Sequence, residues 1–238
     1  DAVIVMTPVY YPFLQAVTNN ERKLITSDLV NENGNYTIDF DDFEKKIVDN
    51  DVKAFILCSP HNPVGRVWRK EELKEMLEIC HRHHVYVISD EIHQDFVFGD
   101  KKQTPSYLMT EHWDEILTIT APSKTFNLAG LNTSNIIIAD DDLRRRFRKT
   151  VTDIGASAIN VMGLTACRAA YESGLPWLQE VRNYIRGNMD FTASYLAENI
   201  PEVRLIRPEG TYLLWLDMRG LGLGDEELER FITQDAGL

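Results

Sequence analysis

The chain has 238 residues, which is enough for one large domain or for one and a half. Its hydrophobic fraction of 44% and aromatic fraction of 10% are typical of a globular protein with a substantial core. The formal net charge of -12 disfavours nucleic acid as a partner, because an acidic surface repels phosphates. No segment is long and apolar enough to predict a membrane span, and we recognise no signal peptide, so we expect a cytoplasmic protein.

Several reactive or charged side chains have ordinary structural explanations. Cys58 lies in an apolar run and Cys80 in a helical pattern, so both are expected to be small core residues in a reducing compartment. The basic residues between 144 and 149 are expected on the solvated face of a helix. The histidines at 81, 83 and 84 end another predicted helix, where positive side chains suit the helix dipole, so we expect no metal site there.

Short apolar runs predict β-strands, and several are apolar on both alternating faces, as in a buried parallel sheet. These runs are 2–6, 23–27, 53–58, 85–89, 116–120 and 134–139. Amphipathic stretches between them predict a helix at 40–50, with Asp39 as its N-cap, and another at 69–83. The alternation of strand and helix predicts an α/β domain with a mainly parallel sheet.

The pattern changes after Asp140. Three consecutive helices are predicted at 141–153, 158–172 and 176–199. Strands at 203–206 and 211–217 and a helix from about Asp225 follow them. We therefore expect a large domain, then connecting helices, then the start of a small α+β domain. The expected ranges are 1–155, 156–198 and 199–238.

Polar and aromatic segments follow four of the predicted strands. They are TPVYYP at 7–12, SPHNPVG at 59–65, DEIHQD at 90–95 and APSKTFN at 121–127. Because ligands bind at the carboxyl ends of the strands in open α/β sheets, we expect the functional residues in these segments.

Lys124 and Asp90 carry the chemistry that we consider first. A lysine at the end of an apolar strand, directed into a cleft, can form a Schiff base with a carbonyl when its pKa is lowered. A carboxylate at the position of Asp90 can keep a pyridinium nitrogen protonated, which makes the ring an electron sink. Taken alone, each has a simpler explanation: a surface lysine after a strand, and a helix cap or turn residue.

Asn62 and Tyr10 are the other two members of the set. Asn62 can donate a hydrogen bond to a phenolate-like oxygen, although it is also an ordinary turn former before proline. Tyr10 can stack on a flat ring, although core or interface packing would also explain it.

Together these motifs resemble the fold-type I enzymes that use pyridoxal 5′-phosphate (PLP), specifically the class I and II aminotransferase superfamily. The family motifs correspond here to Tyr10, Asn62-Pro63-Val64-Gly65, Asp90-Glu91-Ile92-His93 and Ala121-Pro122-Ser123-Lys124. The resemblance covers essentially the whole chain and implies the aspartate-aminotransferase-like fold.

The resemblance also implies a role for each residue. Tyr10 stacks on the pyridine ring, Asn62 binds its O3′ oxygen and Asp90 pairs with its nitrogen. Lys124 forms the Schiff base with PLP and moves the proton at Cα. Family sites are clefts completed by a second subunit, so a homodimer is expected.

This sequence departs from the family pattern at three positions. Ala121 and Asn132 stand where a phosphate-binding serine and arginine are common, and His93 replaces a tyrosine near O3′. Ser123 is then expected to contribute to phosphate binding. The four segments most resemble those of the MalY/PatB-type C–S lyases, or cystathionine β-lyases.

The resemblance leaves several hypotheses open. A C–S lyase cleaves the Cβ–S bond of cystathionine or cysteine-like amino acids and releases pyruvate, ammonia and a thiol. An aminotransferase would use every residue named so far, and a non-catalytic scaffold of the same fold would bind no cofactor. The family's glycine-rich phosphate turn would lie before Asp1 and its carboxylate-binding arginine after Leu238, so we expect this chain to hold part of a site.

Overall fold

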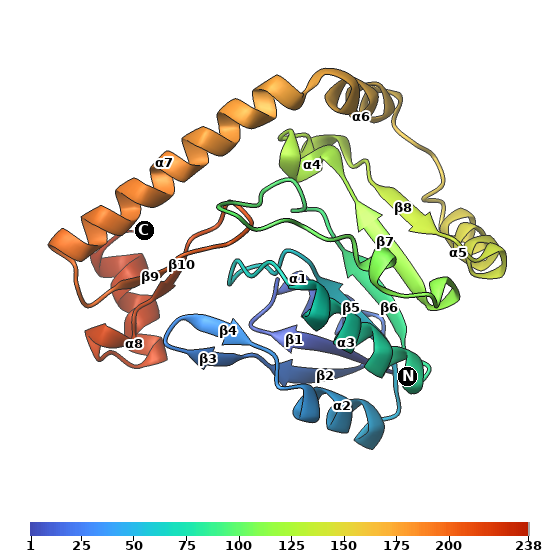
Figure 1. Ribbon diagram of the computed structural model, residues 1–238, viewed down its shortest axis with the longest axis horizontal. Coiled ribbons are helices and arrows are strands. Elements are labelled where there is room, and N and C mark those ends of the chain that lie inside the picture. The colour runs from blue at the N-terminus through green and yellow to red at the C-terminus, as the bar shows by residue number, and fades with distance from the viewer. Residues whose placement is uncertain (238) are drawn as a thin grey trace.

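A six-stranded sheet forms the centre of the computed structural model, which describes residues 1–237 (Figure 1). Its strand order is β2-β1-β5-β6-β7-β8, and only β8 runs antiparallel to its neighbour. The strands are β1 (Ala2–Thr7), β2 (Lys23–Asp28), β5 (Val52–Cys58), β6 (Tyr86–Asp90), β7 (Ile116–Thr120) and β8 (Asn135–Ile138). The predicted α/β fold with a mainly parallel sheet is therefore confirmed.

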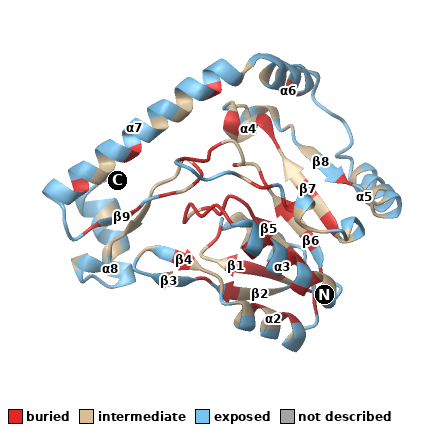
Figure 2. Ribbon diagram, viewed as in Figure 1, coloured by how far each residue is buried: buried red, intermediate tan, exposed pale blue. Residues whose placement is uncertain are grey.

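The strands are apolar on both faces because helices cover both. Ile4 and Phe55 belong to the main core, together with α2 (Phe40–Asp49) and α3 (Lys70–Arg82). The neighbouring side chains Val5 and Ile56 point the other way and pack near α1 (Pro12–Asn19). Figure 2 shows the buried residues concentrated in these strands and in the loops that follow them.

The ends of these helices follow from their sequences. Asp39 caps α2 by accepting a hydrogen bond of 3.0 Å from the backbone N–H of Asp42, as expected. In α3 the contact is reciprocal: Glu72, at the third helical position, accepts the backbone N–H of the N-cap residue Arg69 at 2.8 Å. His81 lies in the last turn of α3, and its Nδ1 lies 2.8 Å from a carboxylate oxygen of Glu115.

The second half of the chain arches over the sheet. Figure 1 shows the long helix α7 running from α6 toward a small two-stranded sheet near the C-terminus. The elements are α5 (Asp141–Asp153), α6 (Val161–Ser173), α7 (Leu175–Asn199), β9 (Arg204–Ile206), β10 (Trp215–Asp217) and α8 (Asp225–Arg230). Leu178 and Met189 on α7 pack with Phe96 and Phe98 in a second apolar cluster.

One expectation about local structure is wrong, and two elements were not predicted. The predicted strand 211–217 is only β10, Trp215–Asp217, because Thr211 has a φ of 68°, which extended backbone excludes. Helix α1 and the hairpin of β3 (Val30–Glu32) and β4 (Asn35–Thr37) were not predicted. Pro12 at the first turn and the Asn33-Gly34 turn are the usual signals for these two elements.

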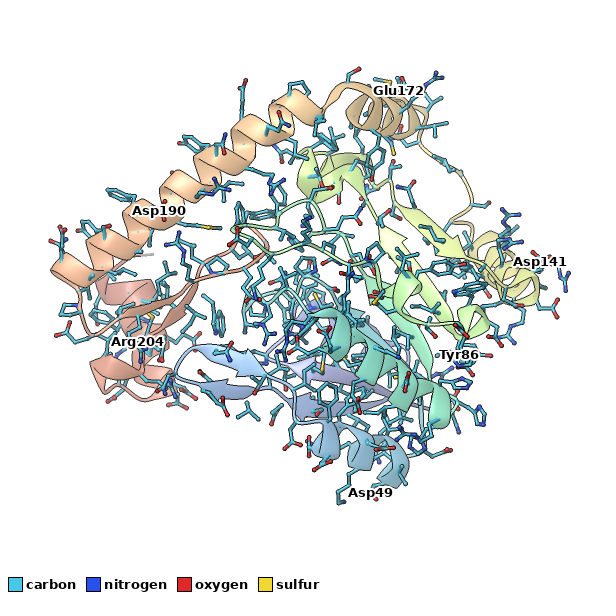
Figure 3. The ribbon with its side chains drawn as sticks, viewed as in Figure 1. Asp49, Tyr86, Asp141, Glu172, Asp190 and Arg204 are labelled. Carbon is cyan, nitrogen blue, oxygen red and sulfur yellow. The ribbon has the colours of Figure 1, made fainter. Side chains whose placement is uncertain are left out.

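The acidic surface lies where the helices meet solvent. Asp49, Asp141 and Glu172 lie at the periphery of the molecule (Figure 3), and each pairs with a basic side chain on its own helix. The basic stretch on α5 contains no buried residue, as expected of a solvated helix face. The three cysteines are buried and free, and Cys58 and Cys80 lie in the hydrophobic core as expected. Among the described residues, no helix has the length and apolar composition needed to span a membrane.

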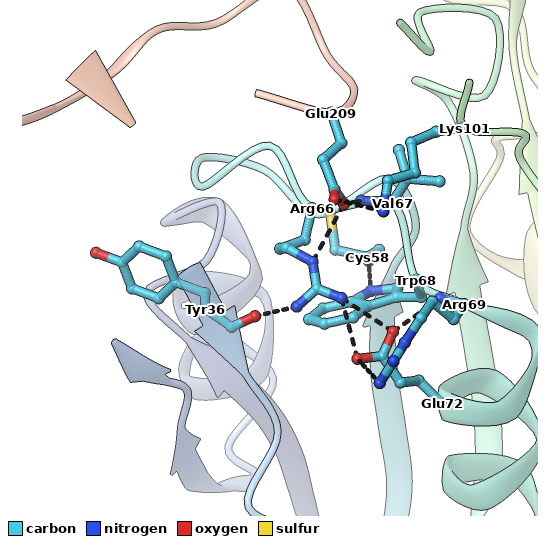
Figure 4. A network of polar contacts seen from close by, with 9 residues as sticks. All are labelled: Tyr36, Cys58, Arg66, Val67, Trp68, Arg69, Glu72, Lys101 and Glu209. Atoms are coloured by element: carbon cyan, nitrogen blue, oxygen red, sulfur yellow. Dashed lines mark hydrogen bonds and ion pairs between the residues drawn. The ribbon is translucent and has the colours of Figure 1, made fainter. Parts of the chain in front are cut away.

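A buried ion network fastens the loop after β5 to its surroundings (Figure 4). The Arg66 guanidinium donates to Glu72 at 2.9 Å and to Glu209 at 3.2 Å, and it also donates to the backbone carbonyl of Tyr36. Arg66 and Glu72 are only 8% and 5% exposed. One side chain therefore joins the β5 loop to α3, to the β3–β4 hairpin and to the C-terminal part of the chain.

Replacing Arg66 with methionine is expected to lower the free energy of unfolding by about 3 kcal/mol, because Glu72 would keep its buried charge and lose its main partner. Chemical denaturation of the two proteins measures the difference. Arg168→Met is the matched control: its pair with Glu172 is exposed, so we expect a change within about 0.5 kcal/mol. Equal losses in both variants would contradict this account of the network.

Candidate active site

The strand order places a ligand site at one end of the sheet. From β1 the chain adds β2 on one side, whereas β5, β6 and β7 follow on the other. The direction of winding thus reverses between β1 and β5. At such a switch point, the loops from the carboxyl ends of the two strands separate and leave a crevice.

A cavity of about 170 Å³ lies at this position. Its lining comes from the loops after β1, β5, β6 and β7, together with a segment close to the C-terminus. The lining residues are Tyr10, Phe13, Cys58, Asn62, Asp90, Ile92, His93, Lys124, Tyr212 and Leu213.

The structure brings together five of the six residues singled out from the sequence. Tyr10, Asn62, Asp90, His93 and Lys124 all line the cavity, and Ser123 does not. Lys124 was expected at the end of a strand. It lies instead on the short helix α4 (Pro122–Thr125), because Pro122 suits the first position of a helix and the chain turns immediately after β7.

Asp90 ends β6 and faces the cavity with a perturbed carboxyl group. Burial raises the pKa of Asp90 to about 6, although the Ile92 backbone N–H donates to its carboxylate at 3.1 Å. The nearby charge of Glu91 raises this pKa further, and that of Lys124 lowers it. A cation in the cavity would favour the ionised form of Asp90, so this residue is suited to pair with a positively charged ring nitrogen.

Glu91 points away from the cavity, as expected for the next residue along. Its carboxylate accepts hydrogen bonds from the Ser89 hydroxyl at 2.9 Å and from the Ser106 backbone N–H at 2.8 Å. Glu91 thereby joins the end of β6 to the segment of Ser106, while Asp90 faces the cavity.

His93 is a buried residue of the cavity lining. The residue is 2% exposed, and its Nδ1 has no hydrogen-bond partner among residues 1–237. Burial, together with the charge of Lys124, lowers the pKa of His93 to about 4, so the imidazole is neutral at pH 7. Because a buried polar atom without a partner is unfavourable, this nitrogen is suited to bind a polar atom of a ligand.

The loop that carries Asn62 is fastened to the neighbouring segments. His61 donates from Nε2 to the carbonyl of Pro8 at 2.9 Å, which joins it to the loop of Tyr10. The Asn62 backbone N–H donates to Sγ of Cys58 at 3.4 Å. The loop after β5 is thus held to the loop after β1 and to the end of its own strand.

His61 is expected to make stability depend on pH. It is 1% exposed, and burial lowers its pKa to about 4. The unfolded chain binds a proton at His61 more readily than the folded chain does, because the unfolded pKa is about 6.5 and the folded pKa about 4. Above about pH 6.5 this difference has no effect on stability, and as the pH falls toward 4 it destabilises the folded state progressively. Between pH 7.5 and pH 5 we expect His61 to account for about 2 kcal/mol of lost stability.

Denaturation at these two pH values tests this expectation in the cofactor-free protein. The His61→Gln variant should lose less stability than the wild type between them. The exposed residue His84, changed to glutamine, is the control and should leave the pH dependence unaltered. An identical pH dependence in wild type and His61→Gln would contradict the prediction.

Half of the cavity lining was not predicted from the sequence. Cys58 was treated only as a core residue, although it is the last residue of β5 and is paired in register with Asp90. Tyr212 and Leu213 come from a segment that was predicted to be a strand, more than eighty residues after Lys124. No local signal connects that segment to the cavity, so it could not have been found from the motifs alone.

The arrangement defines what the site can do chemically. A primary amine, a carboxyl group with a raised pKa and an imidazole nitrogen without a partner line one small cavity. The amine can condense with a carbonyl, the carboxylate can pair with a cation, and the imidazole can bind an oxygen. Tyr10 adds an aromatic ring to the same cavity.

Comparisons with known proteins identify relatives that are similar over nearly the whole chain. The chain is 42% identical to cystathionine beta-lyase PatB of Bacillus subtilis, over 97% of this chain and 60% of the relative. It is 34% identical to Protein MalY of Escherichia coli, over 98% of this chain and 60% of that protein. The chain thus spans about 60% of the length of the curated relatives it matches.

Solved structures show the same fold. Cystalysin of Treponema denticola, which contains a pyridoxal 5′-phosphate cofactor, superposes with a TM-score of 0.97 at 40% identity, covering 100% of this chain and 61% of that chain. The PLP-bound C–S lyase from Staphylococcus hominis gives a TM-score of 0.92 at 36% identity, covering 100% and 60%. Residues 1–237 match the family model for aminotransferase class I and II. The chain therefore belongs to the class I and II aminotransferase family.

Proposed function

We propose that the full-length protein is a PLP-dependent C–S lyase of the cystathionine β-lyase type. One observation carries the proposal: Lys124, Asp90, Asn62, His93 and Tyr10 come from four separate loops and line one cavity. The relatives add support, because one protein named cystathionine β-lyase is 42% identical to the chain and one named C–S lyase is 36% identical.

The residues of the cavity fit the cofactor. The unpaired Nδ1 of His93 and the amide of Asn62 can bind the ring oxygen, and the Asp90 carboxylate can bind the ring nitrogen. Tyr10 offers a ring to stack against, and Lys124 offers the amine for the covalent link. Ser123 precedes Lys124 on α4 and remains our candidate for a phosphate contact, although it lies outside the cavity lining.

The chain's own residues then have distinct tasks. When bound, PLP supplies a carbonyl for the substrate amine and a ring that withdraws electrons from Cα. Asp90 keeps the ring nitrogen protonated through its negative charge. The amine of Lys124 removes the proton from Cα, and the thiolate leaves from Cβ. With one water consumed, cystathionine gives homocysteine, pyruvate and ammonia.

Two measurements test the proposal in the full-length protein. The purified holoenzyme should absorb visible light, and it should release pyruvate and thiol from cystathionine. A colourless protein that takes up no added PLP would instead favour a non-catalytic scaffold. An aminotransferase is the second candidate, because the family contains such enzymes and the same residues would serve both reactions.

The proposal extends to assembly, location and domain organisation. We propose a homodimer, because the family resemblance implies a site completed by a second subunit; an active monomer in analytical ultracentrifugation would refute it. The free, buried cysteines support a cytoplasmic location. We also propose that the chain comprises a large domain (1–155), connecting helices (156–198) and the start of a small domain (199–238).

A further inference from the structure

The residues Pro208–Leu213, which we call the strap, link the small C-terminal sheet to the cavity. The strap lies between two of the cavity loops and is hydrogen-bonded to both. On one side, the backbone N–H groups of Glu209 and Gly210 donate to the carbonyl of Gly65 at 2.8 and 2.9 Å. On the other side, the Thr211 backbone N–H donates to the carbonyl of Phe96 at 2.8 Å. These bonds join the strap to the loop of Asn62 and to the loop of His93.

Glycines allow the strap to approach both loops closely. A Cβ on Gly65, which has a φ of 74°, would lie 2.5 Å from Cβ of Pro208. A Cβ on Gly210 would lie 2.8 Å from the side chain of Val67 and 3.0 Å from the carbonyl of Phe96. No larger residue fits at either place without displacing the strap.

The Glu209 carboxylate holds the strap to the loop after β5 and to Lys101 (Figure 4). It accepts the Val67 backbone N–H at 3.0 Å and the Arg66 guanidinium at 3.2 Å, and it pairs with Lys101 at 2.7 Å. The strap is therefore held by three charge-assisted contacts as well as by its backbone.

Thr211 holds an unfavourable backbone conformation next to the cavity. Its φ is 68°, which is rare for a β-branched residue, and it is fully buried. Its hydroxyl accepts the backbone N–H of Leu213 at 3.2 Å. Strain of this kind persists where the surroundings enforce it, and such positions cluster at functional sites.

The bent backbone places the next two residues, Tyr212 and Leu213, in the cavity lining. The Tyr212 ring lies 5.3 Å from the His93 ring and 5.3 Å from the Phe96 ring, the latter in an edge-to-face arrangement. The packing orients the Tyr212 ring, which is only partly buried and retains surface for a ligand.

We propose that Tyr212 determines substrate specificity by contacting the part of the substrate beyond the sulfur, and that Glu209 is the positioning residue that fixes it. This inference rests on the proposed lyase function. Lys124 and Asp90 define where bonds change, and they come from the carboxyl ends of the sheet strands. Tyr212 and Leu213 reach the same cavity from the C-terminal strap, so they are available to the remainder of the substrate.

The test compares two substrates in the full-length holoenzyme. Cystathionine carries a long group beyond its sulfur and cysteine carries none, so the ratio of their kcat/KM values reports contact with that group. Tyr212→Ala should lower this ratio by at least about tenfold, as expected when a pocket wall of this size is lost. Tyr212→Phe keeps the ring and should keep the ratio. Tyr184→Ala removes a 72% exposed ring and is the control.

Glu209→Gln removes the charge that fixes the strap and should lower the same ratio, by less than Tyr212→Ala. Glu78→Gln is its control, because Glu78 forms only an exposed pair with Lys74. Retention of the visible absorption shows that each variant still binds the cofactor. A ratio equal to that of the wild type in both Tyr212→Ala and Glu209→Gln would overturn the proposal. A Tyr212→Phe variant as impaired as Tyr212→Ala would overturn the assignment of this contact to the ring, because the hydroxyl would then be the important group.

A binding measurement separates this inference from the proposed function. If the wild type makes no pyruvate from either substrate, the lyase proposal fails. Calorimetric titration with norleucine and alanine still tests whether Tyr212 contacts the side chain of a bound amino acid. Tyr212→Ala should then weaken the binding of norleucine at least about tenfold more than that of alanine. Equal weakening for both amino acids would reject the role of Tyr212 independently of catalysis.

Discussion

Lys124→Ala is expected to reduce the formation of pyruvate from cystathionine by at least about 10⁴-fold, because it removes both the covalent link and the proton-transferring amine. Lys124 is the lysine that lines the cavity, and its charge acts on both Asp90 and His93. Among the lining residues within 1–237, no other group offers a primary amine. The loss should therefore appear in kcat rather than in KM alone.

Borohydride reduction gives a second measurement on the same variant. In the wild type, reduction of the holoenzyme should fix a pyridoxyl group on the peptide that contains Lys124, as identified by mass spectrometry. The variant should show no such peptide. Lys149→Ala, which removes an exposed lysine from α5, should behave like the wild type. A pyridoxyl group on any lysine other than 124 would refute the assignment.

Asp90→Ala is expected to lower turnover by several orders of magnitude, about 10²- to 10⁴-fold, while PLP still binds. The negative charge of Asp90 favours a protonated ring nitrogen, which stabilises negative charge at Cα. Burial raises the pKa of this carboxyl to about 6 in the cofactor-free protein. A cation beside it lowers that pKa again, so the group is ionised when it is paired.

The matched variant for this prediction is Asp90→Asn. It keeps the size of the side chain and removes only the charge, so it should be impaired nearly as strongly as Asp90→Ala. Asp49→Ala, on the exposed surface of α2, is the control for charge removal in general. Visible absorption shows whether each variant retains PLP. An Asp90→Asn enzyme with nearly normal turnover would remove Asp90 from the mechanism.

The central sheet could be predicted from sequence because its signal is local. Each parallel strand is a short apolar run, and the helices beside it carry their own caps, such as Asp39. The carboxyl ends of parallel strands meet at one edge, so the segments after β1, β5, β6 and β7 had to lie near one another. That rule is sufficient to predict that Tyr10, Asn62, Asp90 and Lys124 gather at one edge of the sheet.

The strap could not be predicted because its conformation depends on contacts distant in the sequence. The apolar and aromatic pattern of 211–217 favours a strand, but Thr211 has a positive φ and its backbone N–H donates to the carbonyl of Phe96, more than a hundred residues earlier. The close approach of Pro208 to Gly65 depends on a residue more than 140 positions earlier. The sequence around Tyr212 therefore contains no signal that predicts its place in the cavity lining.

Two other differences between the prediction and the structure occur where the sequence does contain a local signal. Lys124 was expected at the carboxyl end of the apolar run 116–120, but Pro122 begins a short helix after β7, and Lys124 lies on that helix. The Asn33-Gly34 turn has both residues at positive φ, 56° and 94°, which is typical of a tight hairpin. These local errors do not move the cavity, because they leave the strand order unchanged.

The partition between elimination and transamination tests the central claim most directly. The full-length holoenzyme is incubated with cystathionine, and separately with an amino acid that has no leaving group together with 2-oxoglutarate. Each factor of ten between the two rates corresponds to about 1.4 kcal/mol in barrier height. We predict that pyruvate and thiol form from cystathionine faster than glutamate forms from 2-oxoglutarate. Rapid formation of glutamate without pyruvate or thiol would contradict the account and identify an aminotransferase.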